Sequence, residues 1–287
     1  MITASGICKR ANLLLLLLLL PVVIFSICAG AQAAHEKSMS PHSISALRSK
    51  AEAGDVTACF KFAEALEDGN GVPRDYAEAA SWYRKAANLG HAAAQNNLGA
   101  MYALGHGVPQ DANEAFRWYM RAAAQGFAPA QNNVGYLYST GTLKDEVQAL
   151  YWYQKSAAQT YPPALSNLAH LYGEGLAVQK DEQHALKLYR QAAELGYAPA
   201  QEMLGLLYFQ GRGTQKNMAE AATWIRKAAE QGFPLAENHL GFLYEHGYGV
   251  EQDLKQAAKW YGEAAAQGLP EAAQNLQTVS TNLQSKK

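Results

Sequence analysis

The apolar residues of this chain recur at a helical spacing along most of its length. In the segment that opens at Ala236, apolar residues stand at Ala236, Leu240 and Leu243, which fall on one face of a helix. A second apolar segment follows after a glycine-containing turn, with Trp260-Tyr261 and then a pair of alanines. This pattern predicts two helices joined by a short turn.

The same pattern recurs in six units, which are 58–93, 94–129, 130–163, 164–199, 200–235 and 236–271. The period is 36 residues, except that the unit 130–163 lacks two residues in its turn. A half unit precedes the first full one, and Ala272 opens another half unit after the last. Stacked repeats of this kind, each touching only its neighbours, predict an all-α solenoid without a single deep cleft.

The turns between and within the units carry their own signals. An acidic or amide residue stands where the N-cap of each second helix belongs: Asp75, Asp111, Asp145, Asp181, Asn217 and Asp253. In five units a Glu or Gln follows three residues later, which predicts a capping box, whereas His184 stands there in the fourth. A glycine ends most of the second helices, at Gly90, Gly126, Gly196, Gly232 and Gly268.

A further glycine lies inside four of the predicted first helices. These residues are Gly99, Gly135, Gly205 and Gly241. A glycine inside a helix costs roughly 1 kcal/mol relative to alanine. Its recurrence at one unit position therefore indicates that a neighbouring helix approaches closely there. The recurring Trp-Tyr pairs are expected to form the core between helices.

The full pattern, A-x-x-x-L-G-x-x-Y-x-x-G-x-G-V-x-x-D-x-x-x-A-x-x-W-Y-x-x-A-A-x-x-G, resembles the Sel-1-like repeat family, a relative of the tetratricopeptide repeats. The resemblance covers residues 44–280 and departs from the pattern at the short loop Gly141–Lys144 and at Phe62-Ala63. It implies a right-handed superhelical solenoid of tandem helix-turn-helix repeats that serves as an adaptor for protein complexes. It also implies an exported bacterial protein, since such members often take part in envelope assembly, signalling or host contact.

The first 33 residues predict an export signal rather than part of the fold. Two basic residues precede an apolar run over residues 13–28, and small residues follow with two overlapping A-x-A motifs. Cleavage is expected after Ala31 or Ala33, which places the protein in the periplasm or outside the cell. An uncleaved membrane anchor is the alternative, but Pro21 within the run and the cleavage motifs favour removal, which leaves no stable membrane span.

Composition narrows the classes of function. The chain has 24 basic and 25 acidic residues, so a basic nucleic-acid-binding face is not expected. Removal of the signal leaves Cys59 as the one cysteine, so the exported fold must rest on packing without an internal disulfide. Residues 34–43 are predicted to be a short linker and residues 281–287 a polar tail.

The first helices are expected to line the concave side of the solenoid. Their unit positions 3, 7 and 10 lie opposite the apolar stripe at about 100° per residue. We predict that a protein or peptide partner binds there, on Tyr136, His170, Leu206, Phe209, Phe242, Asn96, Asn132 and Asn238. The alternative is that the curvature or the terminal helix buries these residues. The asparagines at position 4, which are Asn97, Asn133, Asn167 and Asn275, are expected to tie adjacent helices together more often than to bind a ligand.

An enzymatic function is the first alternative to an adaptor. Some cysteine-rich members of the family are associated with binding or hydrolysing β-lactams, but they carry paired cysteines in each repeat, which this chain lacks. No serine has a lysine three residues later, and no G-x-S-x-G or H-E-x-x-H motif occurs. His239 with His246, and His170 with Glu174, each give two metal ligands without a third. No catalytic residue, metal site or cofactor is therefore predicted.

A structural spacer that holds two envelope components apart is the second alternative. Such a protein would bind its neighbours through its ends, and it would tolerate substitutions on its concave face. An adaptor would not tolerate them.

Overall fold

The computed structural model describes residues 39–140 and 143–285, and the predicted export signal lies outside these residues. Within them the chain forms fourteen helices and no strand, so the all-α prediction is confirmed. No helix among the described residues is long and apolar enough to cross a membrane.

The helices alternate between the first and the second helix of each unit. The first helices are α3 (Val56–Asp68), α5 (Ala92–Leu104), α7 (Ala128–Thr140), α9 (Pro162–Glu174), α11 (Ala198–Gln210) and α13 (Pro234–His246). The second helices are α4 (Tyr76–Asn88), α6 (Ala112–Ala124), α8 (Glu146–Ala157), α10 (Glu182–Glu194), α12 (Met218–Ala229) and α14 (Leu254–Ala266). The array is completed by α2 (Pro41–Glu52) before it and α15 (Pro270–Ser285) after it.

The six predicted N-caps are confirmed, but the capping boxes are formed only in half. A side-chain oxygen of Asp75 accepts from the backbone N–H of Glu78 at 2.9 Å, and each equivalent residue caps its helix in the same way. The backbone N–H of Asp75 donates to the carbonyl oxygen of Leu66 on the first helix, at 3.0 Å. Because this bond recurs in every unit, the Glu side chain is left free for another partner, and Glu78 accepts from Nε1 of Trp82 at 3.2 Å.

The glycines inside the first helices pack against the second helix of the same unit. A Cβ atom on Gly99 would lie 2.9 Å from the ring of Tyr119, and one on Gly241 would lie 2.7 Å from the ring of Tyr261. These contacts confirm the predicted close approach, because no side chain larger than hydrogen fits without a shift. The tyrosines of the Trp-Tyr pairs are correspondingly buried in the core.

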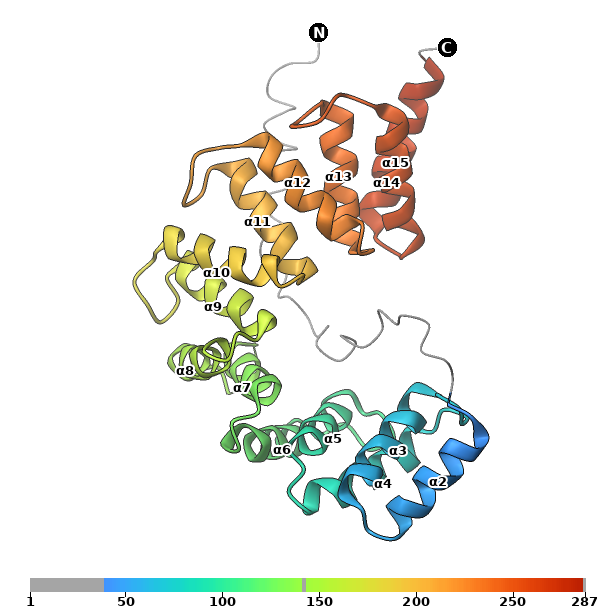
Figure 1. Ribbon diagram of the computed structural model, residues 1–287. Coiled ribbons are helices and arrows are strands. Elements are labelled where there is room, and N and C mark those ends of the chain that lie inside the picture. The colour runs from blue at the N-terminus through green and yellow to red at the C-terminus, as the bar shows by residue number, and fades with distance from the viewer. Residues whose placement is uncertain (1–38, 141–142, 286–287) are drawn as a thin grey trace.

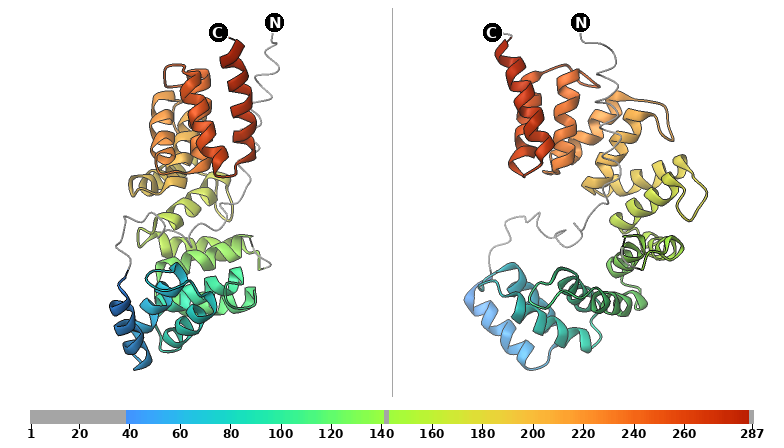
Figure 2. Two further views of the ribbon diagram at one scale, coloured as in Figure 1. Left: turned by 90° about the vertical axis from the view of Figure 1, so that its right-hand side faces the viewer. Right: turned by 180° about the vertical axis from the view of Figure 1, so that it is seen from behind.

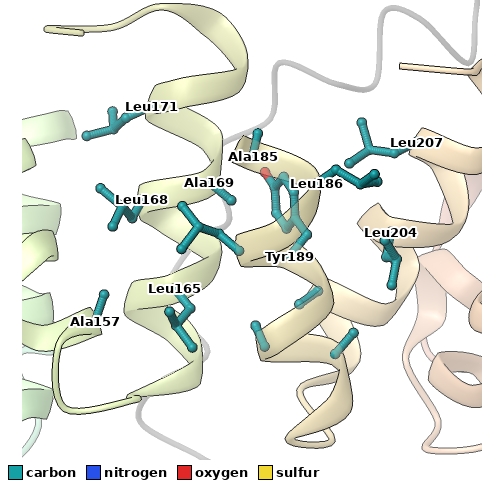
Figure 3. Close-up of a cluster of buried hydrophobic side chains, with 14 of the residues drawn as sticks. Ala157, Leu165, Leu168, Ala169, Leu171, Ala185, Leu186, Tyr189, Leu204 and Leu207 are labelled. Atoms are coloured by element: carbon teal, nitrogen blue, oxygen red, sulfur yellow. The ribbon is translucent and has the colours of Figure 1, made fainter. Parts of the chain in front are cut away.

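The largest cluster of buried side chains spans the middle of the array. It joins Leu168 and Leu171 of α9 to Tyr189 of α10 and to Leu204 and Leu207 of α11 (Figure 3). Each helix thus packs against the preceding and the following one. This arrangement is typical of a solenoid, in which stability comes from contacts between neighbouring repeats.

The array curves into an arc with the first helices on its inner side (Figures 1 and 2). The first helices α9 and α11 approach each other directly, as do α13 and α15, whereas no two consecutive second helices pack as closely. In the middle of the arc α7 lies on the inner side and α8 on the outer side (Figure 1). The first helices therefore form the concave surface, as expected.

The last helix extends into the predicted polar tail, as far as Ser285. Helix α15 continues to Ser285 and buries Val279. No glycine or proline follows Pro270, so nothing in the sequence stops the helix.

Candidate functional site

A ladder of polar pairs ties consecutive first helices together along the concave surface. The side-chain amide of Asn133 donates to Asn96 at 3.0 Å, that of Asn167 to Asn132 at 2.9 Å, and that of Asn275 to Asn238 at 3.0 Å. Position 3 of one unit is thus paired with position 4 of the next. A fourth pair, Glu202 with His239, stands at the same positions between α11 and α13.

This ladder changes the interpretation of three predicted partner contacts. Asn132 and Asn238 are 4% and 7% exposed, and Asn96 is half-buried. Each of them accepts a hydrogen bond from the next unit, so part of its capacity for hydrogen bonding is already used. We therefore assign these asparagines to the junctions between units and leave them out of the candidate surface.

The other predicted residues differ in their exposure. Leu206 is 7% exposed and packs in the cluster around Ile225. It is therefore buried, as the alternative interpretation expected. Tyr136 is half-buried on α7, and His170 is exposed on α9. Phe209 and Phe242 are half-buried on α11 and α13. The structure thus leaves four of the five apolar or aromatic candidates accessible to solvent.

Phe209 and Phe242 belong to a cluster of four rings, which we call the aromatic cluster, with His246 and Tyr248. Ring centroids of Phe209 and Phe242 lie 6.3 Å apart, and those of Phe242 and His246 lie 4.3 Å apart. Tyr248 lies 5.7 Å from Phe209 and 5.6 Å from His246, on which it stacks. None of the four is fully buried. The aromatic cluster is therefore partly exposed to solvent, and it joins units five and six.

Sequence reasoning missed His246 and Tyr248. His246 follows Phe242 by one helical turn, so the i, i+4 spacing could have placed it beside the predicted residue. Tyr248 lies in the turn Gly247-Tyr248-Gly249, whose middle residue reaches toward the unit before it. A single sequence gives no sign of that contact, because it depends on how the units stack.

The opposite end of the concave surface is acidic. Glu64, Glu67 and Asp68 lie in the last two turns of α3, and Glu67 accepts a hydrogen bond from the hydroxyl of Tyr83 at 2.6 Å. Burial, together with the neighbouring charges of Asp68 and Glu67, raises the pKa of Glu64 to about 7. The concave surface is therefore polarised between carboxylates at unit one and aromatic rings at units five and six.

His170 lines a small cavity between α9, α10 and α11. Arg212 bridges Glu174 and Glu182 there at 3.0 and 3.1 Å, and the buried ring of Tyr189 lies beside them. The cavity has a volume of ≈ 30 Å³, which is about the volume of one water molecule. It is too small for an organic substrate.

The described residues contain no group of three or more His, Cys, Asp or Glu side chains that could hold a metal ion. His239 pairs with Glu202, whereas His246 stacks on Tyr248, so the two histidines serve different contacts. Cys59 is 1% exposed, and burial raises the pKa of its thiol, which disfavours the reactive thiolate.

The family model that describes the Sel1 repeat matches six segments of this chain: 56–91, 92–127, 128–161, 162–197, 198–233 and 234–269. The chain therefore belongs to the Sel1 repeat family. The matched units begin two residues before those taken from the sequence pattern, and the third is again two residues shorter than the others.

Solved structures of the same family are similar over most of the chain. A Sel1 repeat protein from Oxalobacter formigenes is 30% identical with a TM-score of 0.72, and the match covers 78% of this chain and 90% of that one. The protein c5321, a protective antigen present in uropathogenic Escherichia coli strains, is 34% identical with a TM-score of 0.68 over 82% of this chain. This chain spans about half (51%) of the length of that antigen.

An immunity protein of Pseudomonas aeruginosa, Pa5087, shares the fold at 24% identity with a TM-score of 0.54, and the match covers 74% of this chain and 81% of that one. The search of curated proteins finds no match to the chain. The comparisons thus establish a repeat scaffold, a class of fold that is typical of binding to other proteins.

Proposed function

We propose that this chain is an adaptor that binds a protein or peptide partner on its concave surface, with the aromatic cluster as the main anchor. The observation that carries the proposal is the packing of Phe209, Phe242, His246 and Tyr248 into one partly exposed group. Soluble proteins rarely keep clustered aromatic side chains in contact with water, and such clusters dominate the binding energy of many interfaces. Tyr136 and His170 extend the same surface along α7 and α9.

The repeats themselves supply substitutions that the fold tolerates. Unit two has Ala103 at the position of Phe209, Ala100 at that of Phe242 and His106 at that of Tyr248. The variant Phe209→Ala/Phe242→Ala/Tyr248→His therefore gives units five and six the inner surface of unit two. The expected result is a native circular dichroism spectrum with loss of the partner.

The test is affinity purification of the mature protein from an envelope extract, with the partners identified by mass spectrometry. The control is Leu89→Gln/Leu195→Gln, which removes two leucines that are 62% and 54% exposed at turns between units, where other units carry glutamine. A partner that stays on the control and is lost from the aromatic variant supports the concave adaptor. A partner that remains on both variants would favour the spacer, which binds through its ends.

Export and action in the cell envelope form part of the same proposal. The support is the basic and apolar pattern of residues 1–33 with its cleavage motifs. Mass spectrometry of the protein from its native cell should show a chain that begins at Gln32 or Ala34. An intact N-terminus on a membrane-bound protein would instead favour the uncleaved anchor.

A further inference from the structure

The outer face of α8 and the turn before it carry an exposed apolar stripe that the concave adaptor does not explain. Leu143, Val147 and Tyr151 are 46%, 64% and 45% exposed, and they make up three of the five exposed large apolar residues in the described chain. Val147 and Tyr151 lie one helical turn apart on the same side of α8, and Leu143 lies in the turn that precedes the helix. Helix α8 lies on the outer side of the arc (Figure 1).

The stripe is particular to the third unit. At the position of Tyr151 the other units carry Ser81, Arg117, Lys187, Thr223 and Lys259. At the position of Val147 they carry Ala77, Asn113, Gln183, Ala219 and Lys255. Every other second helix thus presents small or polar side chains to solvent here, so the repeat itself does not require an apolar residue.

Basic residues of α6, α8 and α10 stand on the Tyr151 side of the stripe, whereas Asp145 and Glu146 stand at its Leu143 end. Arg117 on α6 and Lys187 on α10 stand at the position that Tyr151 occupies on α8, and both are exposed. Arg117 also pairs with Glu114 of its own helix at 2.5 Å, so a partner carboxylate there would share it with Glu114. Nζ of Lys155 lies 4.7 Å from the ring centroid of Tyr151. Arg121 stands one turn further along α6. An apolar strip between basic groups is complementary to an apolar strip between carboxylates.

Two other occupants fit the stripe less well. A second copy of the chain packed about a twofold axis through α8 would bring the basic α6 and α10 of one copy against those of the other, which costs energy by repulsion of like charges. An anionic lipid surface would meet Asp145 and Glu146, which stand at the same end of α8 as Leu143. A helix of a partner protein can place its carboxylates to the sides, toward Arg117, Lys155 and Lys187, and avoid both penalties.

We propose that the outer face of α8 docks an amphipathic helix of a partner protein, with apolar residues spaced at i, i+4 and i+7 or i+8 and acidic residues on both flanks. The apolar residues of that helix would pack along Leu143, Val147 and Tyr151. The acidic flanks would pair with the basic groups of α6, α8 and α10. This surface is separate from the aromatic cluster, so the chain can join two partners through opposite faces.

The test uses two synthetic helical peptides with the same leucine pattern, one with glutamates and the other with lysines on its flanks. Binding to the mature protein is measured by fluorescence anisotropy. The acidic peptide is expected to bind at least tenfold more tightly than the basic one. Val147→Asn/Tyr151→Ser, which introduces the residues of Asn113 and Ser81, should weaken its binding tenfold or more.

Three controls make the outcome decisive. Phe242→Ala/Tyr248→His should leave binding of the acidic peptide unchanged, which separates this surface from the concave one. Vesicles of phosphatidylglycerol that bind the protein better than the acidic peptide does would overturn the proposal in favour of a membrane contact. A dimer in sedimentation that Val147→Asn/Tyr151→Ser dissociates would overturn it in favour of self-association, and equal binding of both peptides would also contradict it.

Discussion

The imidazole Nδ1 of His239 lies 2.9 Å from Oε1 of Glu202, and both side chains are buried between α11 and α13. The pair stands at the two unit positions where three other junctions hold a hydrogen-bonded pair of asparagines. One junction thus holds an acid and a base where three others hold two neutral amides. Glu202 and His239 lie against each other in the buried interior of this junction, so we expect its stability to depend on the match between them.

The first prediction concerns this pair. Glu202→Asn or His239→Asn alone leaves one buried polar group without its matched partner, so each should lower the free energy of unfolding by about 1–3 kcal/mol. The double variant Glu202→Asn/His239→Asn restores the asparagine pair of the other junctions and should return most of the loss. Urea unfolding followed by circular dichroism measures the free energy of unfolding of all three variants. If the double variant lost the sum of the two single losses, the two residues would not act as a matched pair.

The second prediction compares two glycines inside helices. Gly241→Ala should destabilise the protein by about 1–3 kcal/mol, because its Cβ would lie 2.7 Å from the ring of Tyr261. Gly262→Ala on α14 should stabilise it by up to about 1 kcal/mol, since the nearest atom to its Cβ is Cδ2 of Leu276 at 4.0 Å. Thermal unfolding distinguishes them, and shifts of the same sign would refute the role of the close approach.

The fold could be predicted from the sequence because its signals are local and repeated. The N-cap of Asp75, the glycine against Tyr119 and the apolar stripe of each first helix all follow from residues within one unit. The candidate site depends on contacts between units, which no single unit reveals. Leu206 is predicted on the open face but is 7% exposed, because it packs in a cluster that joins α12 of its own unit to α13 of the next.

The same reason explains the asparagines and Tyr248. Asn132 can be seen as an exposed polar residue until Asn167 of the next unit is placed 2.9 Å from it. Tyr248 stands in a turn that the pattern assigns to a connection, and only the stacking of units five and six brings it to Phe209. The position of a residue along a helix predicts the face on which it lies. Which residue of another unit it contacts there depends on how the units stack in the superhelix.

The third prediction concerns the hydroxyl of Tyr189, which is buried beside Gly173. At the position of Gly173 the third unit has Ser139, which lies 3.1 Å from the hydroxyl of Tyr153. Gly173→Ser should therefore supply a hydrogen-bond partner for this hydroxyl, and its Cβ would meet nothing closer than Cβ of Ala185 at 3.4 Å. A gain of about 1–2 kcal/mol is expected from the hydrogen bond and the better helix former.

The control for this substitution is Gly173→Ala, which keeps the gain in helix propensity without the hydrogen bond. The difference between the serine and alanine variants should disappear in a Tyr189→Phe background. Thermal unfolding of the four variants measures it. If the serine variant remains more stable than the alanine variant in the Tyr189→Phe background, the gain does not come from a hydrogen bond to the Tyr189 hydroxyl.

The fourth prediction concerns the pH dependence of stability that Glu64 confers. Its pKa in the folded protein is raised to about 7, chiefly by burial, so the folded state holds this proton more tightly than the unfolded chain, whose glutamate titrates near 4.5. The folded protein therefore loses stability as the pH rises from about 4.5 to about 7. Glu64→Gln removes the charge and should raise the free energy of unfolding at pH 8 relative to the parent, by about 1 kcal/mol once solvent screening is allowed for.

At pH 5 the parent carries the proton on Glu64 in the folded state, so the advantage of Glu64→Gln over it should be small. Urea unfolding at pH 5, 6, 7 and 8 would trace how the difference grows across this window. Gln191→Ala, an exposed change on α10 that removes no titrating group, serves as the control and should alter stability equally at all four values. The stability difference between Glu64→Gln and the parent should not stay constant or shrink as the pH rises. Either result would show that burial and the neighbouring carboxylates do not raise the pKa of Glu64.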